Sequence, residues 1–180
     1  MSNVFFQKKI KSVYRAILRR CCFCSVFLLR HKAAASLATL VQARAGMALN
    51  LADNSISSVG ISVLMTGLAA SMMTGGSLRE LNLSDNAFGD KGLEHVSEAM
   101  SKEVPIERLV LARCKLSNAG AASLAPVLRG NKSTAQLVLA GNGISRKGWL
   151  ELANGLADNK ALLGLDIGAL EAGKVDVRAG

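Results

Sequence analysis

A repeat of 28 residues runs through most of the chain and limits the folds that the sequence can adopt. Leu81, Leu109, Leu137 and Leu165 follow one another at intervals of 28 residues, and Leu49 precedes the first of them by 32. Self-similarity at such a period is typical of proteins built from stacked structural units. Other slots recur in the same register, filled by Leu51, Leu83, Leu111, Leu139 and Ile167, by Asn54, Asn86, Cys114 and Asn142, and by Gly60, Gly92, Gly120 and Gly148.

Each unit predicts one short strand followed by one helix. Leu81 and Leu83 are separated by one residue, so both point to the same face of a strand. Apolar pairs four residues apart, such as Val96 and Met100, form the inner stripe of a helix. The glycine in the first helical turn allows the helix to approach the strand closely. Short polar residues precede the helical half of each unit as expected N-caps, namely Ser57, Asp90, Asn118 and Ser145.

The asparagine slot lies where the chain leaves each strand. A buried asparagine there can hydrogen-bond backbone groups of the turn, and successive asparagines then form a ladder between units. Cys114 takes this slot in the third full unit as a small buried residue with a weak S–H donor. We therefore predict that Asn54, Asn86, Cys114 and Asn142 are structural residues of the repeat.

Over residues 46–170 the chain resembles the leucine-rich-repeat family, and in particular its ribonuclease-inhibitor-like subclass with the pattern LxxLxLxxNx(I/L)xxxGxxxLxxxL. The resemblance implies a right-handed α/β solenoid with parallel strands on the concave face and helices on the convex face. We expect four good repeats and a fifth partial one. The fifth unit has Leu165 and Ile167 in the strand slots, but Leu170 stands in the asparagine slot and residues 171–180 form a short tail.

The first 45 residues differ from the repeats in composition. The net charge of the chain is +9, yet nine of its 22 Lys and Arg residues lie before residue 53 and all 13 acidic residues lie after residue 52. The repeats are therefore neutral as a whole. This distribution argues against a uniformly basic nucleic-acid-binding protein, and we expect no specific nucleic-acid partner.

Three interpretations of residues 1–45 stay open: a targeting or membrane-surface helix, a signal peptide or anchor, and a degenerate capping repeat, of which the first and the third can coexist. Apolar residues at spacings of three and four between Phe6 and Cys21, with basic residues among them, indicate a basic amphipathic helix. Such a helix is typical of a mitochondrial targeting sequence or of a segment that contacts a membrane surface, here through residues 4–29. The third interpretation is a degenerate repeat over residues 20–45 that caps the solenoid. The apolar run Cys21–Leu29 is too short to span a bilayer, which takes about 20 residues.

No arrangement of residues in the sequence indicates catalysis, a metal site or a cofactor. The only histidines are His31 and His95, and the sequence has no phosphate-binding loop, HExxH, GxSxG or suitably spaced carboxylate pair. The four cysteines form neither a CxxC pair nor a disulfide framework, so reduced thiols inside a cell are expected. We predict a protein that is not an enzyme and is cytoplasmic, with a mitochondrial location as the alternative.

The outward strand positions of the concave face are the candidate site for a protein partner, because such a face is the usual binding surface of a solenoid. Glu80 and Asp85 make one half of it acidic, whereas Arg108 and Arg113 make its middle basic. Ordinary pairing between neighbouring strands, Glu80 with Arg108 and Asp85 with Arg113, would explain the same charges. The candidate residues are Asn50, Glu80, Asn82, Asp85, Arg108, Arg113, Gln136 and Asp166.

The sequence thus favours a non-catalytic protein–protein interaction module. One alternative is an organelle-targeted, mitochondrial component of a larger assembly. The other, by analogy with relatives, is a regulator of a small GTPase or of a nuclease. The asparagine and arginine surface on which the GTPase relative depends lies outside the repeated slots, so it has no assigned position on this chain.

Overall fold

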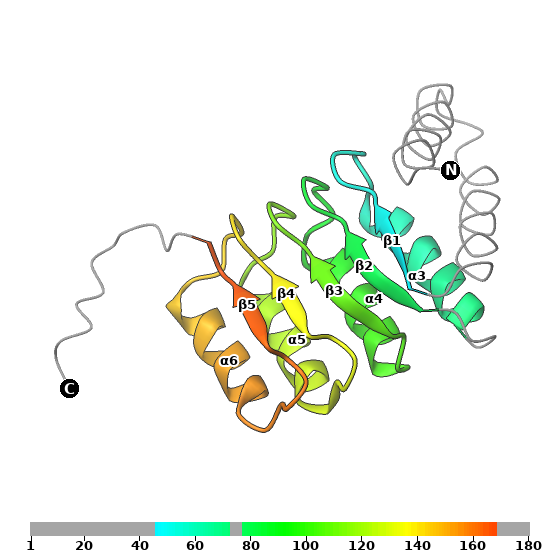
Figure 1. Ribbon diagram of the computed structural model, residues 1–180. Coiled ribbons are helices and arrows are strands. Elements are labelled where there is room, and N and C mark those ends of the chain that lie inside the picture. The colour runs from blue at the N-terminus through cyan, green and yellow to red at the C-terminus, as the bar shows by residue number, and fades with distance from the viewer. Residues whose placement is uncertain (1–45, 73–76, 169–180) are drawn as a thin grey trace, which may run out of the picture.

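The computed structural model describes residues 46–72 and 77–168. The expected N-terminal segment, its membrane-contacting residues 4–29 and the C-terminal tail lie outside these residues. Strands and helices alternate along the described chain (Figure 1). They are β1 (Met47–Asn50), α3 (Ser58–Met72), β2 (Leu78–Asn82), α4 (Gly89–Ser101), β3 (Ile106–Val110), α5 (Asn118–Gly130), β4 (Gln136–Val138), α6 (Arg146–Leu156) and β5 (Gly164–Asp166).

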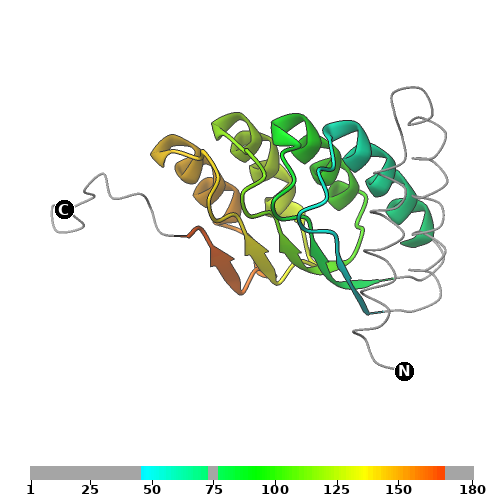
Figure 2. The ribbon, with the colours of Figure 1, turned by 90° about the horizontal axis from the view of Figure 1, so that it is seen from above.

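The strands form one parallel sheet in the order β1-β2-β3-β4-β5, which is also their order along the chain. The repeated leucine slot sets the register, because Leu49, Leu81, Leu109, Leu137 and Leu165 pair across the sheet in a single row. Figure 2 shows the helices in one layer on the outer side of the gently curved strand layer. The α/β solenoid predicted from the repeats is therefore confirmed.

The core lies between the strand layer and the helix layer. The side chains of Leu81, Leu109 and Leu137 have no exposed surface, and Leu83 and Leu111 one slot later are equally buried. On the helix side the core is completed by the inner stripes, for example Val96 in α4 and Leu124 in α5, which are also fully buried. The period-2 and period-3.6 patterns of the sequence thus bury their apolar residues in the same layer.

Two of the four expected helix caps lie inside their helices, Asp90 two residues and Asn118 one residue after the N-cap position. Ser57 and Ser145 do occupy N-cap positions, and the hydroxyl oxygen of Ser57 accepts a long hydrogen bond from the backbone N–H of Gly60 at 3.4 Å. Asp90, in contrast, lies inside the first turn of α4, and Asn118 is the first residue of α5. The cap of α5 is Ser117, whose side chain accepts from the backbone N–H of Ala119 at 3.2 Å.

The displaced residues bind the start of the next unit instead. Ser117 donates from its backbone N–H to the carboxylate of Asp90 at 2.8 Å, and its hydroxyl donates to the same carboxylate. Ser145 donates in the same way to the side-chain oxygen of Asn118 at 2.8 Å. Asp90 and Asn118 therefore link the start of one helix to the start of the next, where the first N–H groups of a helix have no partner in their own helix.

The repeated glycines have a different role from the one expected. A Cβ on Gly148 would meet Ile144 Cγ2 at 2.7 Å and Asn118 Oδ1 at 2.6 Å. At Gly92 the obstructing group is the Phe88 ring, four residues earlier. The slot thus makes room for a core side chain of the preceding turn and for the polar link between helices. A close approach of helix to strand is not what the glycine provides.

Candidate functional site

The asparagine slot connects the turns of neighbouring units through side-chain hydrogen bonds. Asn86 is fully buried, and its amide oxygen accepts from the backbone N–H groups of Asn54 at 3.1 Å and Ile56 at 2.9 Å. Its amide nitrogen donates to the carbonyls of Leu51 at 2.9 Å and Leu83 at 2.8 Å. One side chain therefore satisfies backbone groups of its own unit and of the unit before it.

Asn142 repeats this pattern two units after Asn86. Its oxygen accepts from the backbone N–H groups of Cys114 at 2.9 Å and Leu116 at 3.1 Å, and its nitrogen donates to the carbonyls of Leu111 and Leu139 at 2.8 Å. Among the described residues, Asn54 donates to the carbonyl of Ala52 within its own turn, at 2.8 Å.

Cys114 occupies the slot between these asparagines. Its thiol is fully buried and donates to the carbonyls of Leu83 at 3.3 Å and Ala112 at 3.4 Å. Burial raises the pKa of the Cys114 thiol to about 11, so the group is a neutral thiol at physiological pH. A neutral buried thiol is a poor nucleophile, so Cys114 has the properties of a structural residue.

The middle of the concave face carries a row of polar side chains in contact. Arg108 donates from Nη1 to the side-chain oxygen of Gln136 at 2.9 Å, and its Nε lies 3.9 Å from a carboxylate oxygen of Glu80. These three residues stand opposite one another in β2, β3 and β4. The sheet register therefore brings three of the candidate residues together as one polar row.

A second contact joins Asp85 and Arg113 in the loops that follow β2 and β3. The guanidinium group donates from Nε to Oδ1 at 2.6 Å and from Nη2 to Oδ2 at 2.8 Å. The hydrogen bond from Arg113 lowers the pKa of the Asp85 carboxyl below its ordinary value of 3.8 and raises the pKa of Arg113. Two parallel hydrogen bonds fix the orientation of both side chains at the edge of the concave face.

The remaining three candidate residues serve the strand ends. The side-chain oxygen of Asn50 accepts from the backbone N–H of Ala52 at 3.0 Å, and that of Asn82 accepts from Ser84 at 3.0 Å. Asp166 accepts in the same way from Gly168 at 2.8 Å. Each contact forms a local turn in which an Asn or Asp side chain binds the backbone two residues on. Only their other polar atoms are left for a partner.

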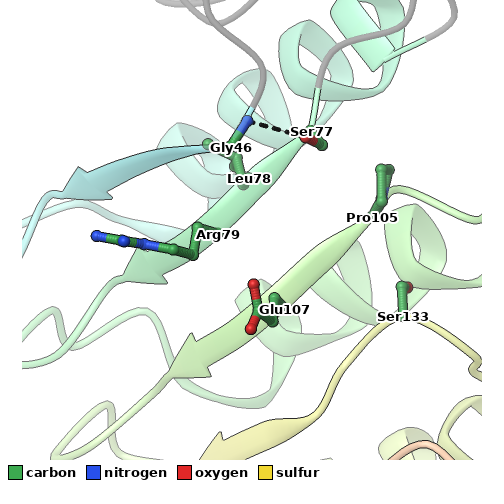
Figure 3. A pocket seen from close by; sticks show the side chains of 7 residues that line it. All are labelled: Gly46, Ser77, Leu78, Arg79, Pro105, Glu107 and Ser133. Atoms are coloured by element: carbon green, nitrogen blue, oxygen red, sulfur yellow. Dashed lines mark hydrogen bonds between the residues drawn. The ribbon is translucent and has the colours of Figure 1, made fainter.

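Cavities on the described surface are shallow. One of about 200 Å³ lies where β2 and β3 begin (Figure 3), beside Gly46 and Pro105. Arg79 and Glu107 project from neighbouring strands there, and neither forms an ion pair with another described residue. A larger depression of about 460 Å³ lies at the ends of α4 and α5. Sites for small molecules usually enclose the ligand in about 300–1,000 Å³.

Within residues 46–72 and 77–168 no group of three or more His, Cys, Asp or Glu side chains is placed to hold a metal ion. No helix in this part of the chain is long and apolar enough to cross a membrane.

Sequence reasoning missed a left-handed backbone position in the turns after β1, β2, β3 and β4. Asp53, Asp85 and Arg113 have φ values of 55°, 59° and 53°, and Gly141 takes the same place with 69°. A Cβ on Gly141 would meet the Arg113 side chain at 2.7 Å from Cγ, so the aliphatic part of Arg113 lies against this glycine. The signal was present in the sequence, because Asp85, Arg113 and Gly141 are spaced by 28 residues.

A second asparagine ladder at the helix ends was also missed. Asn131 accepts from the backbone N–H groups of Ser133 and Thr134, and Asn159, 28 residues later, accepts from those of Ala161 and Leu162. Asn159 also donates to the carbonyl of Asn131 at 3.2 Å. Extending the repeat alignment past the helical stripe would have found this pair.

Comparison with known proteins finds similarity to proteins with leucine-rich repeats. A family model described as "Leucine Rich repeat" matches residues 77–97. Ribonuclease inhibitor from Sus scrofa is 37% identical over 116 residues, which cover 64% of this chain and 25% of that protein. NACHT, LRR and PYD domains-containing protein 3 from Mus musculus is 37% identical over 91 residues, which cover 50% of this chain and 9% of that protein. The chain thus spans about a quarter, or less, of the length of these relatives.

A solved structure, Leiomodin-1 Actin-Binding Site 2, has a similar fold. The TM-score is 0.65 at 15% sequence identity, and the superposition covers 85% of this chain and 84% of that one. At this level of identity the likeness concerns the fold alone.

Proposed function

The chain is a leucine-rich-repeat protein of the ribonuclease-inhibitor-like kind, and from this we infer that it binds another protein through the concave face of its sheet. The observation that carries this proposal is the polar row on that face. Arg108 contacts Glu80 on one neighbouring strand and Gln136 on the other, and the Asp85–Arg113 pair lies in the loops that follow β2 and β3. Side chains fixed in this way lose little conformational entropy when a partner binds.

The proposed role is binding without catalysis. Curated relatives include proteins named ribonuclease inhibitor, a name that describes inhibition of an enzyme. The candidate contact residues remain Asn50, Glu80, Asn82, Asp85, Arg108, Arg113, Gln136 and Asp166. Arg108 and Arg113 are the more exposed members of the two charged pairs among these residues, at 45% and 61% of their side-chain surface, so we expect them to contribute most to partner choice.

Affinity capture from the native host with paired variants tests this proposal. The concave variant combines Arg108→Glu with Arg113→Glu. The control combines Lys102→Glu with Arg129→Glu at the helix ends, which changes the net charge by the same amount. We expect the concave variant to lose a protein that both wild type and control retain, while all three unfold at similar temperatures. Equal capture by the two variants would overturn the concave-face assignment.

Inhibition of a ribonuclease is the second candidate, and the 37% identity to ribonuclease inhibitor favours it. A ribonuclease assay with the purified chain tests it directly. Inhibition that the concave variant loses and the control keeps would support this role, whereas unchanged nuclease activity at high protein concentration would exclude it for the enzyme used.

We further propose a cytoplasmic location, with the mitochondrial assembly component as the alternative. Deletion of residues 1–20 separates the two. A change of location on deletion would support targeting. An unchanged location together with aggregation of the repeats would support a cap.

A further inference from the structure

The charges of the described residues are divided along the solenoid axis. Residues 46–72 and 77–105 contain seven acidic and three basic side chains. Residues 106–168 contain four acidic and eight basic side chains. The solenoid is neutral as a whole but polar from one end to the other, and local potential of one sign steers and orients partners.

Three exposed basic side chains lie where the chain passes from a strand to the following helix, in the turn before α5 and in the first turn of α6. We call Lys115, Arg146 and Lys147 the basic rim. Lys115 lies in the turn before α5, and the other two open α6 in the neighbouring unit. All three are exposed, and none of them takes part in an ion pair with another described residue.

Two acidic groups at the same edge are already engaged. Asp85 accepts two hydrogen bonds from Arg113, and Asp90 accepts two from Ser117. The rim itself is held by the link between Asn118 and Ser145, directly before Arg146. Glu151 follows Lys147 by four residues on α6 and is exposed, but it forms no ion pair with another described residue. The partial positive charge at the start of α5 and α6 adds to the potential of the rim cations.

An apolar side chain lies beside the rim. Leu150 follows Arg146 by four residues and Lys147 by three, so it shares their face of α6. It is 62% exposed, more than most large apolar residues of the solenoid. A leucine beside two cations of the rim suits a ligand that is acidic and carries an apolar residue of its own.

We propose that the basic rim, with Leu150, binds an acidic segment of a protein partner. The inference rests on the proposed function as a protein-binding solenoid and adds the chemistry of the partner. Three cations and one leucine are too few for stable attachment to an anionic membrane, which takes about 4–8 basic residues in a cluster. Trp149, two residues after Lys147, is half-buried and packs against the core, so its ring is not a free platform on which nucleic-acid bases would stack.

Fluorescence anisotropy with the full chain tests the proposal. The probe is a labelled peptide rich in Asp and Glu with one leucine, and its counterpart has Lys in place of every acidic residue. The rim variant combines Lys115→Gln, Arg146→Gln and Lys147→Gln. The matched control combines Arg129→Gln, Lys132→Gln and Lys160→Gln, three exposed cations at the helix ends. Because residues 1–45 are basic and identical in all three proteins, their background binding cancels in the comparison.

We expect the rim variant to bind the acidic peptide about tenfold more weakly than wild type, which corresponds to about 1.4 kcal/mol. The control should stay within about twofold of wild type, because its charges lie at the opposite edge. Leu150→Ala should weaken binding in a manner that added salt does not change. Equal binding by the rim variant and the control would overturn the proposal.

Two further probes separate the partner classes. Single-stranded DNA and vesicles with anionic lipid are titrated against the same three proteins. Rim-dependent binding that is tighter for either of them than for the acidic peptide would overturn the assignment to a protein segment. If the rim fails while the concave variant still loses its captured protein, only the rim proposal falls. If the concave variant captures every protein normally while the rim effect is present, the concave-face proposal falls.

Discussion

Arg113 binds Asp85 of the preceding unit with two parallel hydrogen bonds, of 2.6 Å and 2.8 Å, so a side chain in one repeat orients a side chain in the next. Both residues occupy the same left-handed position of the turn, with φ values of 53° and 59°. Gly141 takes this position in the following unit, where a Cβ would collide with the Arg113 side chain. The side chain of Arg113 thus lies between Asp85 of the preceding unit and Gly141 of the following one.

The pair predicts an acid-dependent change that can be read at one carboxyl group. The pKa of Asp85 is lowered in the folded protein, so its ionised form is stabilising above the ordinary value of 3.8, and this stabilisation is lost as the pH falls through the lowered pKa. Arg113→Gln should return the pKa of Asp85 towards 3.8 in an NMR titration. Lys102→Gln, which removes the cation beside Glu98, should leave Asp85 unchanged.

Replacement of Asn86 should be the most damaging change in the asparagine slot. Asn86→Ala leaves buried backbone N–H and C=O groups of two units without partners, and we expect a loss of about 3 kcal/mol in the free energy of unfolding. Asn142→Ala removes a similar set of bonds at a half-buried site, where water replaces some of them, so its loss should be smaller. Urea denaturation measures both. A larger loss for Asn142→Ala would contradict this ranking.

The buried thiol predicts a stability change in alkali. The pKa of Cys114 is about 11 in the folded protein against 9.0 in its ordinary state, so the unfolded chain loses the proton first. Stability contributed by the protonated thiol is complete below pH 9 and is lost as the pH rises from 9 to about 11. Thermal unfolding across this range should show a steeper decline for wild type than for Cys114→Ala. Parallel declines would show that other groups cause the loss.

Thr134→Val should stabilise the protein. The side-chain hydroxyl of Thr134 is buried without a hydrogen-bond partner among the described residues, and equivalent slots hold Leu78 and Ile106. Valine has the same shape without the unsatisfied polar atom, so we expect a gain of about 1 kcal/mol in the free energy of unfolding. Thr66→Val is the control, because the hydroxyl of Thr66 is exposed and donates to the carbonyl of Ser62 at 2.9 Å. A loss of stability for Thr134→Val would show that the hydroxyl has a partner.

At Gly155 the backbone of α6 lies very close to the backbone of α5. A Cβ there would meet the backbone of Ala125 in α5, with the carbonyl carbon at 2.8 Å, and backbone cannot move aside as a side chain can. Gly155→Ala should therefore lower the free energy of unfolding by about 1–3 kcal/mol. Gly130→Ala is the matched control, because the space around Gly130 is open. Calorimetry of the two variants should show a drop in melting temperature for Gly155→Ala alone.

The pairing of the leucines across the sheet was predictable, because the burial of each leucine follows from the pattern of its own repeat unit. Leu81 and Leu109 are buried for the same reason, and a period in the sequence becomes a row in the sheet. The caps were less predictable, because Asp90 and Asn118 bind backbone of the following unit and not of their own helix. A propensity for N-caps describes one helix and carries no information on its neighbour.

The candidate site was predictable in its charged part only. The spacing of 28 residues correctly placed Asp85 beside Arg113, since equal slots stand side by side in a parallel stack. The turn-forming role of Asn50 and Asn82 was not anticipated, because an outward strand position and a strand end look alike in sequence. The basic rim was missed for a similar reason, since Lys115 and Lys147 occupy different slots of the repeat, and only the fold places them at the same edge of neighbouring units.

The side-chain ladders also determine how the molecule would respond to force. Asn86, Asn142 and Asn159 each bond to the unit directly before their own, and the extensive helix contacts are between successive helices. A pull along the solenoid axis therefore loads these junctions in series. At the junction between the second and third units, Cys114 donates to the carbonyl of Leu83 in place of an amide network, and the Asp85–Arg113 pair and the Asp90–Ser117 contact cross the same junction. Polar contacts outside the asparagine slot therefore share the load there.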